Sequence, residues 1–209
     1  FPVAAKETLD GAKWDIIASF DWFFLLSANL FVVASLALIF MPVGKIRLGG
    51  QDATPEFSTL SWFAMLFAAG MGIGLMFWAV AEPTAYYTGW YKTPFNVEPN
   101  TPAAADLAMG ATMYHWGLHP WAIYAIVALS LAFFAFNKNM PLTIRSAFFP
   151  LLRDWVWGWP GHIIDVLAVV ATIFGLATSL GFGAQQAASG LDYLFGVGSG
   201  INVQMAIIV

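Results

Sequence analysis

The sequence predicts an all-α integral membrane protein that crosses the bilayer several times. Of its 209 residues, 60% are hydrophobic and only 10% are charged, and the mean hydropathy is +0.74. A helix needs roughly 20 apolar residues to span a bilayer. Four uncharged stretches reach that length and a fifth is still apolar at the last residue; they cover 22–44, 57–81, 107–137, 166–191 and 193–209. A soluble domain of this size does not need so much apolar surface.

We expect one transmembrane domain over residues 1–209. Its spans are predicted at about 21–42, 57–83, 107–136, 165–189 and, incompletely, 201–209. The third span is long enough for a tilt or a break near Pro120. The chain begins without methionine and ends inside an apolar segment, which suggests a piece of a longer protein.

The segments between the spans differ in composition. Phe1–Phe20 carries several charges and is weakly amphipathic, so we expect a surface helix ahead of the first span. Thr84–Ala105, rich in proline and tyrosine, is typical of an interfacial loop with an aromatic belt. Segment 137–161 combines basic residues with tryptophans, which predicts a cytoplasmic amphipathic or interfacial helix. Gly190–Gly200 is expected to be a short loop.

The basic residues predict the orientation of the spans. The loops after the first and third spans hold Lys45, Arg47, Lys138, Arg145 and Arg153, against Lys6, Lys13 and Lys92 on the opposite side. Lys and Arg are enriched in cytoplasmic loops. We therefore expect loops 44–56 and 137–161 to face the cytoplasm and the start of the chain to lie outside.

The second uncharged stretch contains alternating glycines. Residues 68–74 read Ala-Ala-Gly-Met-Gly-Ile-Gly, and each glycine costs about 1 kcal/mol relative to alanine inside a helix. Gly70 and Gly74 alone would form a G-x-x-x-G packing face, but Gly72 points to nearly the opposite side. We therefore predict a helix that loosens here and exposes backbone carbonyls. At membrane depth such backbone is tolerated only against protein or a water-lined cavity, as in transporter binding sites.

The third span is rich in aromatic residues. Segment 114–124 reads Tyr-His-Trp-Gly-Leu-His-Pro-Trp-Ala-Ile-Tyr. Trp121 and Tyr124 are i,i+3 neighbours on a helix, and Trp116 joins them around one cavity if Pro120 bends the chain. Aromatic faces attract quaternary ammonium groups by about 2 kcal/mol or more in a dry site. The rings therefore form either a cage for such a cation or, alternatively, ordinary belt or lipid-facing filler.

Polar residues within the spans have two interpretations each. His115 and His119 show the i,i+4 spacing of metal-ligand pairs, but the glutamate of H-E-x-x-H and a further ligand cluster are missing. We favour imidazoles satisfied by neighbouring backbone over a membrane metalloenzyme. Thr172, Thr178 and Ser179, near Gln185 and Gln186, offer oxygens to Na⁺ but also commonly bond to their own or a neighbouring helix.

The remaining signals are structural or exclude a class of protein. Asp21, Glu82, Asp106 and Asp165 fall at predicted span ends, where we expect them to cap helices. The chain has no cysteine, which excludes disulfides and thiolate metal sites within it. No basic cluster indicates a nucleic-acid partner.

Two motifs together resemble a known family. Phe67–Thr84, FAAGMGIGLMFWAVAEPT, and His115–Tyr124, HWGLHPWAIY, are similar to segments of the betaine/carnitine/choline transporter (BCCT) family. The resemblance reaches from before the first span to Ser189. It implies a LeuT-like fold of twelve spans containing two inverted five-helix repeats. This chain would be a fragment holding spans two to five and the start of six.

The resemblance also implies roles for individual residues. Trp116, Trp121 and Tyr124 match the aromatic box of the family. The carbonyls of Ala68 and Met71 would bind sodium, and the segment would contact the substrate through Ala69, Gly70, Met71, Gly72 and Gly74. Thr172 would contribute to a second sodium site, although Leu176 stands where sodium-coupled relatives often carry a second hydroxyl. Gly74 is aspartate in similar proton-coupled choline carriers, so glycine here favours a zwitterion as substrate.

The implied function is secondary active transport rather than catalysis. The substrate would be glycine betaine or a similar quaternary-ammonium or onium compatible solute, imported for osmoprotection with sodium as the coupling ion and no other cofactor. The alternatives are a sodium-independent or proton-coupled choline or carnitine transporter or exchanger, and a non-transporting structural or receptor fragment. Expected partners are the substrate, membrane lipid and further copies in a homotrimer. The expected location is the plasma (inner) membrane, with several passes.

Overall fold

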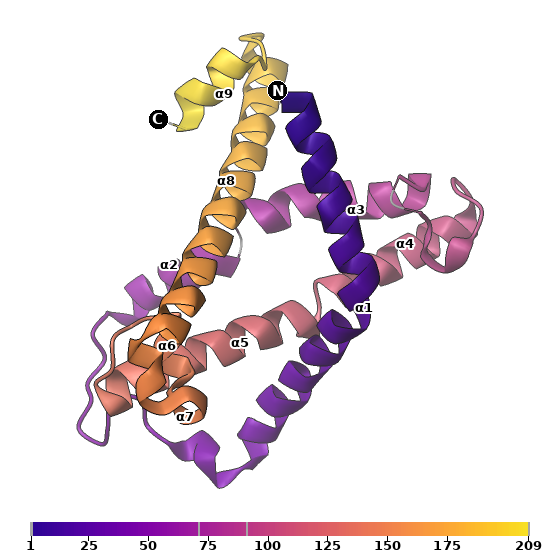
Figure 1. The fold of residues 1–209 in the computed structure, drawn as a ribbon. Helices are drawn as coiled ribbons and strands as arrows, with labels where there is room; N and C mark the ends of the chain where they lie inside the picture. The colour runs from indigo at the N-terminus through magenta and orange to yellow at the C-terminus, as the bar shows by residue number, and fades with distance from the viewer. Residues whose placement is uncertain (1, 71, 91, 209) are drawn as a thin grey trace.

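The computed structural model describes residues 2–70, 72–90 and 92–208, and the regular elements in those residues are all helical (Figure 1). The prediction of an all-α protein is therefore confirmed. The main helices are α1 (Pro2–Phe40), α2 (Thr59–Gly70), α3 (Ile73–Thr88), α4 (Pro102–His115), α5 (Leu118–Ala132), α8 (Trp159–Phe195) and α9 (Ile201–Ile208). Short helices α6 (Ile144–Ala147) and α7 (Phe149–Leu152) lie between α5 and α8.

Three helices within the described residues are long and apolar enough to cross a membrane: Ala4–Phe40, Pro102–Asn137 and Trp159–Phe195. At 1.5 Å per residue, the 39 residues of α1 extend about 58 Å, well beyond the roughly 30 Å of bilayer hydrocarbon. The expectation of a separate surface helix over Phe1–Phe20 is therefore wrong, because one helix continues from Pro2 to Phe40. Helix propagation is cooperative, and Gly11 alone does not stop it.

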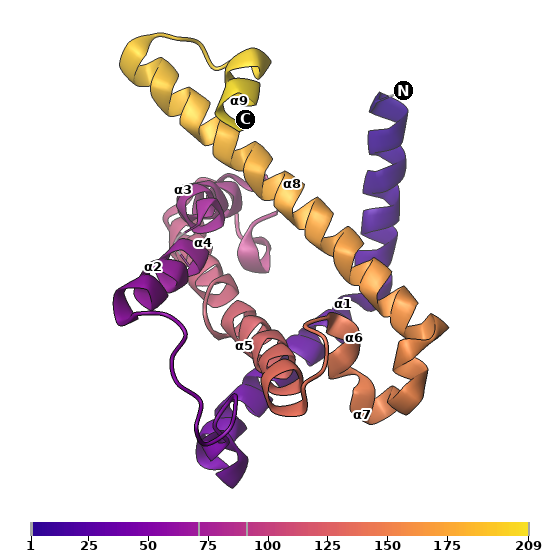
Figure 2. The same cartoon turned by 90° about the vertical axis from the view of Figure 1, so that its left-hand side faces the viewer.

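Two interrupted helices lie side by side in opposite directions (Figures 1 and 2). The chain runs through α2 and α3, turns at residues 89–101, and returns through α4 and α5, with α3 packed against α4. This antiparallel arrangement brings the α2–α3 interruption close to the α4–α5 interruption. Helix α1 crosses α5, and α8 crosses α3, where the Phe182 ring stacks on Phe77 at 4.7 Å.

The predicted third span is broken near Pro120, as expected, with the break itself at Trp116–Gly117. Gly117 has φ −76° and ψ −128°, and a Cβ there would come within 2.9 Å of the Met113 carbonyl oxygen. Only glycine fits this backbone. Pro120 is the third residue of α5, in the first turn, where its missing N–H leaves no intrahelical hydrogen bond unmade.

The connecting segments also differ from their expected lengths. Residues 137–161 form short helical turns rather than one surface helix, because prolines at 141, 150 and 160 interrupt them. Within this segment, the Arg145 guanidinium forms an ion pair with Asp165 on α8. Helix α8 runs on to Phe195, so the loop predicted at Gly190–Gly200 is shortened to 196–200. It begins at Gly196, whose left-handed φ of 67° ends the helix.

The loops after the first and third spans lie on the same side of the molecule. The Asn137 side-chain amide donates to the Arg47 carbonyl at 2.9 Å, and its oxygen accepts the Gly49 N–H at 3.1 Å. This agrees with the prediction that loops 44–56 and 137–161 share one face of the membrane. That this face is cytoplasmic stays a prediction, as do the span limits within the bilayer.

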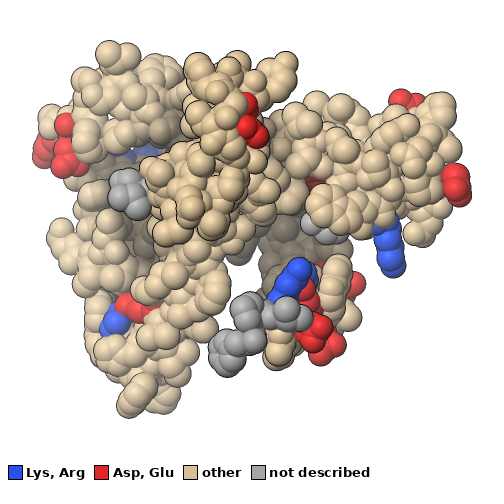
Figure 3. Space-filling view, turned by 90° about the horizontal axis from the view of Figure 1, so that it is seen from above, with Lys and Arg blue, Asp and Glu red and all other residues tan. Residues whose placement is uncertain are grey.

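Packing between the helices relies on small side chains. Most of the buried apolar residues are alanines, among them Ala85 on α3, Ala104 and Ala108 on α4, and Ala184 and Ala188 on α8. Small residues let helix backbones approach closely, as is typical of membrane proteins. Large apolar side chains are mostly exposed, and the view from above shows only scattered charges (Figure 3). This surface suits a lipid environment.

Candidate functional site

The glycine segment interrupts a helix, as its alternating glycines predict. Helix α2 ends at Gly70, Gly72 adopts an extended conformation with φ −61° and ψ 175°, and α3 begins at Ile73. The last four carbonyls of a helix have no intrahelical donor, and the carbonyl of Ala68 is one of them. Ala69 and Gly70 belong to the same final turn. Met71, the second expected sodium ligand, lies outside the described residues.

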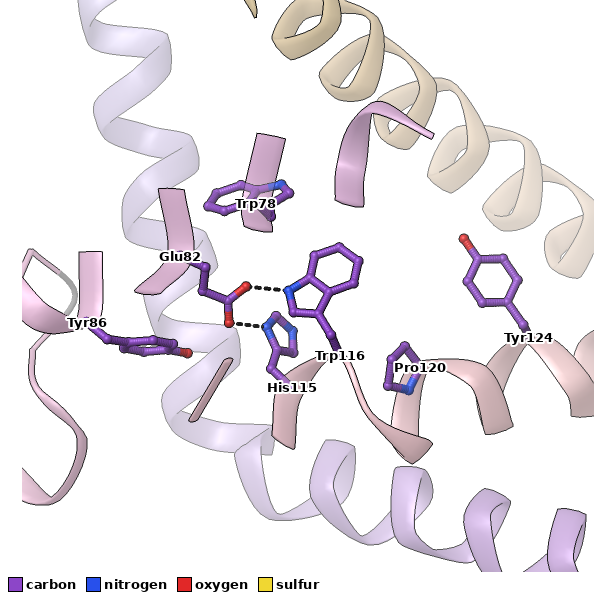
Figure 4. Close-up of a pocket in the computed structure, with 7 residues that line it drawn as sticks. All are labelled: Trp78, Glu82, Tyr86, His115, Trp116, Pro120 and Tyr124. Atoms are coloured by element: carbon purple, nitrogen blue, oxygen red, sulfur yellow. Dashed lines mark hydrogen bonds and ion pairs between the residues drawn. The ribbon is translucent and has the colours of Figure 1, made fainter. Parts of the chain in front are cut away.

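A cavity of about 560 Å³ lies beside this interruption (Figure 4). Its wall combines residues of both broken helices: Trp78, Glu82 and Tyr86 from α3, His115 at the end of α4, Trp116 at the break, and Pro120 and Tyr124 from α5. Gly74 faces the same tryptophan, since a Cβ at Gly74 would lie 3.9 Å from Cη2 of Trp116. The structure therefore joins the glycine segment to the predicted aromatic box.

Two of the three predicted box residues line this cavity, namely the partly buried Trp116 and the largely exposed Tyr124. Trp121 is not among the described residues that line the cavity. The Trp121 ring instead packs beside Tyr124, with centroids 6.0 Å apart and an interplanar angle of 36°. The Trp121 indole N–H donates to the carbonyl of Trp116 at 3.2 Å, a carbonyl just beyond the end of α4.

Glu82 does not cap a helix, contrary to our expectation. It lies inside α3, which continues to Thr88, and it is only 6% exposed. One carboxylate oxygen is 2.6 Å from Nδ1 of His115, and the other accepts the indole N–H of Trp116 at 2.6 Å. Asp165 caps a neighbouring helix rather than its own, because it accepts the Arg145 backbone N–H in the first turn of α6 at 3.2 Å and also pairs with the Arg145 side chain.

The imidazoles of His115 and His119 bond to side chains. The expectation that neighbouring backbone groups satisfy them is therefore wrong. His115 contacts Glu82, while Nε2 of His119 lies 3.3 Å from the amide oxygen of Asn29 on α1. The two rings therefore serve different helix contacts. Among the described residues, no group of three or more His, Cys, Asp or Glu side chains is arranged to hold a metal ion.

The two threonine hydroxyls of α8 bond to their own helix. Thr172 donates to the carbonyl of Ala168 and Thr178 to that of Phe174, each at 2.8 Å. Thr172 lines a second cavity of about 350 Å³, together with Thr143. A helix-bonded hydroxyl still has a free lone pair, so a sodium role for Thr172 stays a prediction.

Sequence reasoning missed part of the cavity wall on α3. Trp78, Glu82 and Tyr86 recur every four residues, which places them on one face of a helix. This spacing was the sequence signal that could have predicted that the three side chains line one cavity. Pro83 obscured it, because a proline inside a helical pattern usually marks the end of the helix, whereas here the helix continues past it.

The sequence is similar to known transporters along its whole length. The profile of the BCCT, betaine/carnitine/choline family transporter, matches residues 1–209. Glycine betaine transporter 1 of Vibrio parahaemolyticus is 67% identical over 204 residues, which are 98% of this chain and 39% of that protein. A glycine betaine/proline/choline/ectoine transporter of the same organism is 60% identical over 207 residues, which are 99% of this chain and 37% of that protein. A glycine betaine transporter of Bacillus subtilis is 49% identical over 208 residues, which are 100% of this chain and 40% of that protein.

The chain thus spans about two-fifths of the length of these relatives. The family profile covers every residue, and both the interrupted helix and the aromatic cavity fall within the matched region. We conclude that the chain belongs to the betaine/carnitine/choline transporter family of membrane proteins.

Proposed function

We propose that the full-length protein imports glycine betaine, or a similar onium compatible solute, across the plasma membrane. The observation that carries this proposal is the cavity lined by Trp116, Tyr124 and Trp78, on and next to an interrupted helix. The names of the relatives support the substrate class, because each of the three is called a transporter of glycine betaine.

The cavity has the chemistry that a trimethylammonium group requires. Such a group cannot donate a conventional hydrogen bond, so it is held by ring faces rather than by polar partners. Both carboxylate oxygens of Glu82 already have N–H partners. The rings of Trp116, Tyr124 and Trp78 therefore supply the main attraction for the headgroup.

The interrupted helix suits the other end of a zwitterion and a coupling cation. Helix α2 ends with carbonyls that carry partial negative charge, while α3 begins with N–H groups that carry partial positive charge. The Leu75 and Met76 N–H groups bond to the Gly72 carbonyl, so the N–H groups of Ile73 and Gly74 precede the first bonded donors. A substrate carboxylate binds to such N–H groups. The carbonyls of Ala68 and Met71 bind sodium in this proposal.

Sodium moving down its gradient drives uptake by alternating access. The site binds sodium and substrate together, and their joint binding favours the conformation that opens to the other side. A second sodium at Thr172 would assist, with Thr178 or Ser179 in place of the hydroxyl missing at Leu176.

The second candidate is a sodium-independent exchanger or a proton-coupled carrier of choline or carnitine. One observation favours it. Leu176, one helical turn after Thr172, offers no oxygen, and the Thr172 hydroxyl is bonded to its own helix. A carrier without a second sodium site depends less on the sodium gradient.

Uptake of labelled glycine betaine tests the proposal. The full-length protein is expressed in cells lacking other betaine carriers, with sodium present or replaced by N-methylglucamine. We expect saturable uptake, and its rate should fall at least about tenfold when sodium is replaced. A tenfold change corresponds to about 1.4 kcal/mol of coupling free energy between sodium and substrate. Uptake that persists without sodium supports the exchanger. No uptake of betaine in either medium overturns the proposal. Competition by unlabelled choline, carnitine, proline and ectoine ranks the substrates.

A further inference from the structure

The buried carboxylate of Glu82 joins the two interrupted helices at their breaks. Glu82 is on α3, which follows the first interruption, while His115 and Trp116 stand at the second, where α4 ends. Their ring nitrogens lie 2.6 Å from different oxygens of the same carboxylate (Figure 4). A buried carboxylate is tolerated only when its oxygens have partners. Here both oxygens have one.

We propose that Glu82 is the positioning residue of the aromatic cage, holding the Trp116 indole and, through it, the Trp121 indole. This proposal rests on the proposed function, because it assigns how the same cavity is organised for an onium headgroup. Glu82 acts through the tryptophans and is not itself the counter-ion of the substrate.

The first step is the orientation of Trp116. An indole has a single N–H and no acceptor, so one strong hydrogen bond determines which way its ring edge points. That N–H is directed at Oε2 of Glu82, which leaves the ring face to the cavity (Figure 4). Hydrogen bonds to a charged acceptor are roughly twice as strong as neutral ones. The ring is therefore held even before substrate enters.

The second step carries this order to the other rings. The end of α4 leaves the Trp116 carbonyl without a helical donor, and the Trp121 indole N–H bonds to it at 3.2 Å. Trp121 in turn packs against Tyr124, with 6.0 Å between ring centroids. Glu82 binds the side chains of both His115 and Trp116, so its loss would free the chain at the break, and a shift of the Trp116 backbone would move the acceptor of Trp121.

The third step concerns the second oxygen of Glu82. His115 occupies it, so the carboxylate cannot rotate away from Trp116 without losing a partner. Both oxygens are directed at ring nitrogens of the protein (Figure 4). A carboxylate arranged in this way orients rings and is poorly placed to contact a cation directly.

Two conservative variants separate positioning from charge. Glu82→Gln keeps the length of the side chain, accepts the Trp116 N–H through its oxygen, and donates to His115 through its amide. Glu82→Asp keeps the charge but is one methylene too short to reach both partners. Positioning predicts that aspartate is the worse substitute, whereas a counter-ion role predicts that glutamine is worse.

We would measure glycine betaine uptake by the full-length protein, with KM and kcat determined separately. We expect KM to rise about threefold in Glu82→Gln and about tenfold or more in Glu82→Asp. The change should lie mainly in KM. The matched control is Glu98→Gln, at an exposed residue between α3 and α4, which should match wild type. Equal KM values for both Glu82 variants and wild type overturn the proposal, and so does a larger effect of glutamine than of aspartate.

A double-mutant cycle tests whether Glu82 acts through Trp116. If it does, Glu82→Asp adds little once Trp116 is replaced by leucine, because the ring to be oriented is gone. Additive changes in KM overturn the proposal. The amount of folded protein, measured by size-exclusion chromatography, identifies any variant that only fails to fold.

A readout without substrate keeps this proposal separate from the proposed function. In protein labelled with 5-fluorotryptophan, ¹⁹F signals of Trp116 and Trp121 are assigned by replacing each with phenylalanine. Both signals should shift in Glu82→Asp and much less in Glu82→Gln. Unchanged signals in both variants overturn the positioning role even where betaine is transported. Shifted signals in a protein that binds no betaine leave the positioning role intact and remove only the proposed substrate.

Discussion

At the scale of single residues, aromatic rings rather than free charges form much of the wall of this cavity. Trp116 is the central residue, since it contacts Glu82 through its N–H and faces Gly74 with the far edge of its ring. Tyr124 completes the wall from α5, and Trp121 supports it from the side. In the proposed site, the residues that hold the cation therefore differ from those that orient the rings.

Replacing Trp116 by leucine should raise the KM for glycine betaine about 30-fold, the equivalent of about 2 kcal/mol of cation–π attraction. Trp121→Leu should have a smaller effect, because that ring stands beside the cavity and is 52% exposed. Uptake kinetics of each variant check this. Trp155→Leu, at an exposed tryptophan of the 153–157 turn, is the control. Unchanged KM in both cage variants would show that the cage assignment is wrong.

Gly74→Asp should shift the preference from glycine betaine toward choline. A Cβ at Gly74 makes only ordinary contact with Trp116, at 3.9 Å, so the side chain has room. The added carboxylate attracts a net cation but repels the carboxylate of a zwitterion. We expect the ratio of choline to betaine uptake to rise about tenfold or more. Gly74→Ala adds the carbon without the charge, and a gain of choline uptake in that variant would contradict the electrostatic explanation.

Two interruptions, rather than whole helices, define the site at the scale of elements. One lies between α2 and α3 and the other between α4 and α5, and antiparallel packing brings them together. Each leaves carbonyl or N–H groups without helical partners, and the cavity is lined by α3, by the second break and by α5. Glycines cause both interruptions, through lost helix propensity at 70–74 and through a close backbone approach at Gly117.

Gly72→Ala should weaken sodium-dependent uptake, because alanine is more favourable than glycine inside a helix by about 1 kcal/mol. This shifts the equilibrium between the continuous and the interrupted helix roughly fivefold toward the continuous form. The extended φ of −61° at Gly72 is open to alanine, so the protein should still fold. The measurement is the sodium concentration for half-maximal uptake, which should rise. Gly110→Ala, inside α4 with open space around it, is the matched control and should leave sodium dependence unchanged. Equal responses of both variants would contradict this account.

At the scale of the whole molecule, the hydrogen bonds of Asn137 join the loops after the first and third spans. These loops hold most of the basic residues, and the turn at residues 89–101 connects the far ends of α3 and α4. Most of the basic residues of the chain therefore lie on one face. The distribution of Lys and Arg and the hydrogen bonds of Asn137 both place the loops after the first and third spans on the same side of the membrane.

Cysteine labelling of intact cells tests this orientation. The chain contains no cysteine, so single probes can be introduced into it at exposed positions, in a full-length protein without other cysteines. Gln51→Cys and Asp154→Cys should resist an impermeant maleimide, whereas Glu98→Cys should react. Labelling after cell lysis provides the control for accessibility. Labelling of the first two in intact cells, with protection of the third, would reverse the predicted orientation.

Local features of the sequence predicted the helices, the membrane class and the break at the glycines. Each depends on residues close together in the chain: apolar runs, charges at their ends, and helix-breaking glycines. Features that depend on distant contacts were predicted poorly. Glu82, for example, was expected at a helix end, but it lies within α3 and contacts His115 and Trp116. Helix α1 ran on without a boundary because neither proline nor a cluster of glycines stopped it.

By itself, the sequence determined that this is a helical membrane protein with a weakened helix and a group of aromatic rings, since composition and spacing act within one or two turns. Only the tertiary structure decided that Glu82 meets His115 and Trp116, which are 33 and 34 residues away. That meeting requires α3 and α4 to pack antiparallel at a particular register. The register is decided by how small residues such as Ala85, Ala104 and Ala108 fit between the two helices.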